Sequence, residues 1–230
     1  MDVSEIILET ILENTKPASH DDPGMDGGSI LALVNMFEGL LAKHDQEDGS
    51  TEDRKEFTNN IVTTTSVLIE QEQGWSEIES ESLRSQLFSS NLLSMDNMGY
   101  IFGKHENTSE CNQEEHNFPS ENVNLKVRAI SSSESNTCYT FDSLGSSGSI
   151  CLPPSDVRDE VNDCSIHVAS SFSIDSEKNN FFPDSFKHAN SSFFGKSLIG
   201  LRIDNGSIDI QIPEDAAPII VTFKHEENKV

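Results

Sequence analysis

The most constraining feature of this sequence is the alternation of apolar and polar residues within Lys196–His225. Three short runs in it, Ile199–Ile203, Ile208–Ile212 and Ile219–Phe223, carry an aliphatic or aromatic residue at every second position. A period of two places these side chains on one face of a strand, which is the pattern of a half-buried antiparallel sheet. Asn205-Gly206 lies between the first two runs and tolerates the positive φ angles of a type I′ turn, so the sequence predicts a hairpin there.

The N-terminal part of the chain follows a helical period instead. Apolar residues recur at spacings of three and four within 3–12, 30–41, 57–69 and 88–102. This spacing predicts amphipathic helices that each turn one face towards a core. Ser29 is a suitable N-cap for the second helix. Ser50 with Asp53, and Ser76 with Glu79, have the spacing of capping boxes for the third and fourth helices.

The period changes after the polar segment 106–120. Val123–Ala129, Cys138–Phe141 and Ile166–Ile174 are predicted strands, and Gly145–Ser149 is predicted to be a flexible turn because Gly and Ser favour turns. The expected fold class is α+β, with an N-terminal helical subdomain packed on a C-terminal antiparallel, twisted β-sandwich. The predicted division is a helical subdomain over 1–105, a linker over 106–120 and a β-sandwich subdomain over 121–230.

The charge of the chain argues against two classes of partner. The formal net charge is -25, whereas nucleic acids and anionic membrane surfaces are bound by clustered Lys and Arg. No apolar run approaches the ~20 residues that span a bilayer. The first residues, Met1–Glu5, are acidic and lead straight into an amphipathic pattern, which is not the basic start and apolar run of a signal peptide.

The cysteines form an even set, Cys111, Cys138, Cys151 and Cys164, without the Cys-x-x-Cys spacing of a zinc site. We predict a disulfide between Cys138 and Cys151, because a short Gly/Ser-rich loop separates them and both flank strand-like runs. Cys111 with Cys164 is then the remaining pair, although four cysteines allow three pairings.

Glycosylation sequons occur at Asn107, Asn190 and Asn205. Together with paired cysteines they favour an oxidising, extracellular setting. An intracellular acidic scaffold is the alternative that the missing signal peptide favours, and free thiols at all four cysteines would support it.

No pattern of catalytic residues is present. The sequence has no Gly-x-Ser-x-Gly elbow, phosphate loop, dinucleotide fingerprint or His-Glu-x-x-His helix, and its seven histidines are scattered. We therefore predict no catalytic, cofactor-binding or metal-binding residues, and a protein that is not an enzyme.

The order of these features resembles the GAIN domain of adhesion G-protein-coupled receptors, which is similar to a region of polycystin-like proteins. The resemblance is carried by the helical stretches Leu31–Leu41 and Phe57–Trp75, the strand-like Glu121–Val127 and the closing stretch Lys196–His225. It covers almost the whole chain. It implies a helical subdomain packed on a twisted sandwich, at the extracellular face of the plasma membrane.

The resemblance also implies what would follow this chain. Members of the family cut themselves at a His-Leu-Ser/Thr site in a motif rich in Cys and Trp, after the strand that resembles Ile219–His225. The sequence to Val230 contains neither that motif nor that triplet, so no catalytic role is carried onto His225. The implied partners are the stalk strand and seven-helix membrane region beyond it, and an extracellular protein ligand.

Two hypotheses of different classes remain. In the first, the chain is a receptor ectodomain module that holds the strand following it. In the second, it is a secreted or surface adhesion module with no receptor behind it. A Cys/Trp-rich motif and seven apolar segments encoded beyond Val230 would support the first, and a stop codon there would support the second.

Overall fold

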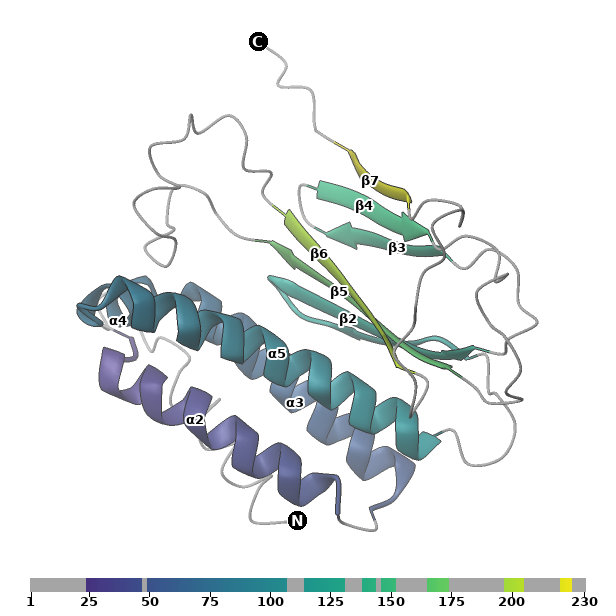
Figure 1. Ribbon diagram of the computed structural model, residues 1–230, viewed down its shortest axis with the longest axis horizontal. Coiled ribbons are helices and arrows are strands. Elements are labelled where there is room, and N and C mark those ends of the chain that lie inside the picture. The colour runs from purple at the N-terminus through teal and green to yellow at the C-terminus, as the bar shows by residue number, and fades with distance from the viewer. Residues whose placement is uncertain are drawn as a thin grey trace.

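A computed structural model describes residues 24–46, 49–106, 114–130, 138–143, 146–151, 165–173, 197–204 and 220–224 (Figure 1). Helices cover one face of a first sheet, and a second sheet covers its other face. The helices are α2 (Gly27–His44), α3 (Thr51–Glu70), α4 (Glu72–Glu77) and α5 (Glu81–Glu106). The strands are β1 (His116–Pro119), β2 (Val123–Ile130), β3 (Cys138–Ser143), β4 (Ser146–Cys151), β5 (Ser165–Ser173), β6 (Ser197–Asp204) and β7 (Ile220–Lys224).

The strands form two antiparallel sheets. Sheet A, the middle layer, has the strand order β1-β2-β5-β6, and sheet B, the outer layer, has the order β3-β4-β7. The α+β class predicted from the sequence, with helices packed on an antiparallel sandwich, is confirmed. Both β6 and β7 come from the C-terminal region of period two, and they lie in different sheets.

The alternation in β2 separates the two faces of sheet A. Val123, Leu125 and Val127 are buried on the face towards the helices, and Val127 lies opposite Val168 of β5. These residues share one hydrophobic core with large helical side chains, among them Phe37, Phe57, Trp75, Met95 and Phe102. Trp75 is fully buried, and its indole N–H donates to the carbonyl of Leu68 at 2.7 Å, so burial leaves no polar atom of this ring without a partner.

Two glycines bring α5 close to sheet A. A Cβ atom at Gly99 would lie 2.7 Å from Cγ1 of Val168, and one at Gly103 would lie 2.5 Å from Cγ2 of Ile166. Carbon atoms in contact sit about 3.5–4.0 Å apart, so any larger residue would push the helix away from the sheet.

The helix caps agree in part with the sequence. The capping box predicted at Ser50–Asp53 is confirmed, with both reciprocal bonds present. The N-cap of α2 is Asp26 rather than Ser29, because the Asp26 carboxylate accepts the Ser29 N–H at 2.7 Å; this bond lowers the pKa of Asp26. The box predicted from Ser76 is wrong, since Ser76 lies inside α4, and a hydroxyl at Ser80 accepts a first-turn N–H of α5 instead.

Two predicted connections contain strands. Gly145–Ser149 was expected to be a turn, but β4 begins at Ser146, since pairing with β3 and β7 outweighs the weak strand propensity of Gly and Ser. β1 lies within the predicted linker 106–120, anchored by the buried ring of Phe118. The division into two subdomains stays a prediction.

Three other predictions, the helix over 3–12, the turn at Asn205-Gly206 and the run Ile208–Ile212, lie outside the described residues.

Replacing Gly99 with Ala should destabilise the protein by about 1–2 kcal/mol, because the cost of overpacking against the sheet exceeds the gain in helix propensity. The matched control is Gly39→Ala in α2, where a Cβ atom would meet nothing within 4 Å. That change should stabilise by about 0.5–1 kcal/mol. Urea denaturation of the two variants measures both changes in the free energy of unfolding. Changes of equal size and sign would contradict the close approach of α5 to sheet A.

Candidate functional site: the outer sheet and its disulfide

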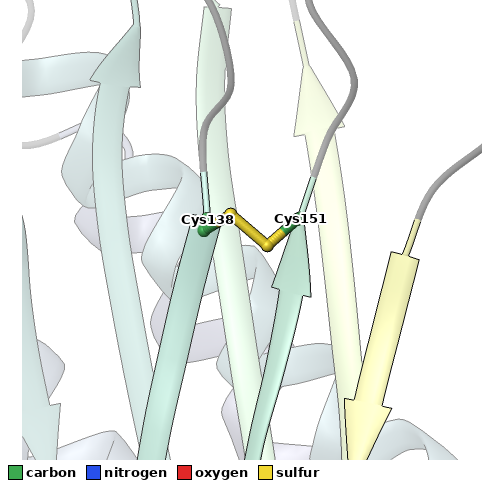
Figure 2. The surroundings of a disulfide bond; sticks show 2 residues. All are labelled: Cys138 and Cys151. Carbon is green, nitrogen blue, oxygen red and sulfur yellow. A yellow bond between two sulfur atoms is a disulfide. The ribbon is translucent and has the colours of Figure 1, made fainter. Parts of the chain in front are cut away.

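A disulfide closes the open end of the β3–β4 hairpin. Cys138 and Cys151 lie directly opposite each other in the register, with Cα atoms 4.1 Å apart, and their sulfur atoms are bonded (Figure 2). The bridge predicted from the sequence is therefore confirmed. Cys111 and Cys164 lie outside the described residues.

A second hydrophobic core joins the hairpin to sheet A. It contains Tyr139, Phe141 and Ile150 of sheet B, with Ile130 and Ala169 of sheet A and the partly buried Leu201 of β6. These residues stack the two sheets face to face. Two polar side chains of sheet A lie against this core. The ring centroid of His167 is 6.1 Å from that of Tyr139, and the Lys126 ammonium is 5.8 Å from the centre of the Phe141 ring.

β7 is the end strand of sheet B. It pairs with β4 from Cys151↔Ile220 to Ser147↔Lys224. On its other side no strand is present among those that the structure describes. An edge strand carries a row of backbone N–H and C=O groups that can pair with a further strand. What this edge can do chemically is to bind an extended segment through main-chain hydrogen bonds.

A polar groove of about 520 Å³ lies elsewhere, between the first half of α3 and the edge strand β1. Its lining residues are Glu52, Lys55, Glu56, Asn59, Glu115, His116, Asn117 and Phe118. Glu115 is engaged there by Lys126 at 2.6 Å. This groove was not predicted from the sequence, although its α3 residues recur at helical spacing on the face opposite the apolar stripe of that helix.

One exposed ion pair links the ends of two helices. The Lys104 ammonium of α5 donates to Asp45 just after α2 at 2.9 Å, and His105 Nε2 lies 3.5 Å from the same oxygen. The hydrogen bond from Lys104 holds the pKa of Asp45 below its usual range. The attraction is therefore fully present at neutral pH and is lost as the carboxylate takes up a proton in acid.

Other predicted sites are not located here. The sequons at Asn107, Asn190 and Asn205 lie outside the described residues. Within the described ranges, no group of His, Cys, Asp and Glu side chains has the arrangement of a metal site. None of the helices described is long and apolar enough to cross a membrane.

Comparison with protein families gives no match, and comparison with curated proteins gives none either. Among solved structures, the chain is similar to the full extracellular region of zebrafish Gpr126/Adgrg6, with a TM-score of 0.39 and 12% sequence identity over 86% of this chain. The matched part is 28% of that chain. At this TM-score the likeness establishes neither a family nor a function.

Replacing Cys138 and Cys151 together with Ser should lower the free energy of unfolding. The bridge closes a loop across a sequence separation of 13 residues, and a loop of this size is worth about 3 kcal/mol in the chain-entropy description. Urea denaturation measures the loss, with Thr140→Ala, an exposed change in the same hairpin, as the control. A double variant that unfolds at the same urea concentration as Thr140→Ala would show that the bridge does not stabilise the sandwich.

Proposed function

We propose that this chain is an extracellular, GAIN-like module of an adhesion G-protein-coupled receptor on the cell surface, and that it holds the stalk segment following β7 as an added strand of sheet B. Its partners are then that stalk strand, the seven-helix membrane region of the same receptor and an extracellular protein ligand. The module takes part in signalling and adhesion through packing and strand pairing, and it is not an enzyme.

The observation that carries this proposal is that β7 pairs with β4 on one side and has no neighbouring strand on its other side among those described. The strand is paired through β4 to a hairpin that is closed by a disulfide, so the template for a further strand is fixed in place. The segment that follows in the chain leaves from β7 itself, so its pairing would be intramolecular and would need only a short connection. Each added backbone hydrogen bond contributes about 0.5–1.5 kcal/mol net.

Two further features support an extracellular location. The Cys138–Cys151 bridge is typical of proteins that fold in oxidising compartments. The sequons at Asn107, Asn190 and Asn205 are the acceptors that secreted and surface proteins use. The order of the sequence features, which resembles that of the GAIN domain, supports the choice of receptor family.

Extending the chain through the strand-length segment encoded after Val230 should raise its unfolding temperature. Several added hydrogen bonds, less the entropy of ordering the segment, are worth about 2–3 kcal/mol, or roughly 5–10 °C for a protein of this size. The unextended chain should also associate more readily, because its sheet edge is open. Thermal unfolding and light scattering at equal concentration measure both effects.

The matched control is the same extension with a proline in the middle of the added strand, since proline cannot donate to a ladder. It should return the unfolding temperature towards that of the unextended chain. Equal midpoints for all three proteins, each monomeric, would remove the holding role, and a secreted or surface adhesion module without a receptor would then be the better description.

A further inference from the structure

A half-buried polar cluster lies where α5 meets sheet A. Its members come from three elements: Asp96, Asn97 and Tyr100 from α5, Ser170 from β5 and Arg202 from β6. Arg202 lies opposite Val168 in the register, so it shares the helix-facing side of the sheet. Its guanidinium donates to Asn97 Oδ1 at 2.5 Å and lies 4.8 Å from the centre of the Tyr100 ring.

Asp96 is the member whose contacts are incomplete. Its Oδ1 atom and Ser170 Oγ across the interface are both buried, and neither has a hydrogen-bond partner of good geometry among the described residues. The Ser170 hydroxyl still faces the carboxylate closely enough to favour its ionised form. An ionised carboxylate can only accept hydrogen bonds, whereas a protonated carboxyl can also donate one. Taking up a proton would therefore remove a buried charge and provide a donor for Ser170.

The charges around Asp96 do not compensate for its burial. Burial raises the pKa of Asp96 to about 6, against the smaller lowering effects of the Ser170 hydroxyl on β5 and the Arg202 charge on β6. On α5 itself, the cluster also contains the ring of Tyr100, which lies beside the Arg202 guanidinium. Arg202 is the charged group among the described residues that acts on Asp96.

We propose that Asp96 is a proton-operated latch between α5 and sheet A, which tightens when the surroundings acidify and loosens at neutral pH. The latch does not depend on the proposed strand-holding role. It would act when an extracellular protein enters an acidic compartment, where a proton from the solvent binds the buried carboxylate and no other bond changes.

The direction follows from proton linkage. An Asp in the unfolded chain titrates near pH 4, while Asp96 in the folded protein holds its proton up to about pH 6. Between these values unfolding releases a proton, so stability is greatest at the acidic end and falls as the pH rises through the window. Over the whole window the unfolding equilibrium constant should increase about 100-fold through this group.

The direct test is to follow the carboxyl carbon of Asp96 by NMR while the intact chain is titrated. A midpoint close to pH 6 is expected, and Arg202→Gln should raise it further by removing the positive charge. A midpoint near that of an ordinary Asp, about pH 4, would overturn the proposal.

The second test compares unfolding of the wild type and Asp96→Asn between about pH 4 and pH 8. The ratio of their unfolding constants should grow about 100-fold with rising pH, because the amide keeps the shape of the side chain and never ionises. Glu79→Gln is the matched control, since it removes the same charge from an exposed position next to α5. The ratio of unfolding constants between the wild type and this control should not change with pH. A flat ratio for Asp96→Asn as well would show that the residue has only a packing role and would overturn the latch.

Discussion

The packing of α5 against sheet A is the contact on which the rest of the structure depends. α5 touches α2 and α3 on one side and β2 and β5 on the other, so it joins the helical layer to the strands. The close approach requires residues without a side chain at Gly99 and Gly103. Helix α5 is therefore packed both against other helices and against the sheet. A helix packed on two sides cannot move away from the sheet or from the other helices without opening a cavity in the core.

Sheet A is likewise covered on both faces, and its strand β5 is buried on both. Its helix side carries Val127 and Val168, and its other side carries His167 and Ala169, all of them buried. Sheet B can dock only because the strands of sheet A place small or apolar residues such as Ala169 on that outer face. The second core is small, which gives the Cys138–Cys151 bridge a larger share in keeping the β3–β4 hairpin in register.

Sequence periodicity predicted the parts of the fold in which one face of an element is apolar. The alternation in β2 and the helical stripes of α2 and α3 are examples. The capping box at Ser50 was predictable for a different reason, because its two partners lie three residues apart in the sequence. β4 was missed because its Gly and Ser residues form a strand only through their partners on both sides. The disulfide was predictable, since its cysteines flank a short loop. The groove beside β1 and the cluster at Asp96 were not, because they join distant residues: Asn97 and Arg202 are 105 positions apart.

β6 connects the two regions for which roles are proposed. On the helix side of this strand Arg202 contacts Asn97 and Tyr100, while the neighbouring Leu201 packs on the opposite side into the core shared with sheet B. β6 also contacts β4, the strand that pairs with β7. These contacts alone do not couple the Asp96 cluster to the edge of β7. Coupling requires an element with two arrangements whose equilibrium is shifted by both sites. Protonation of Asp96 can supply such a bias, because it changes the charge beside Arg202 while leaving the second core untouched. The strand edge at β7 would then respond to pH only if β6 moves as a unit, carrying Leu201 with Arg202.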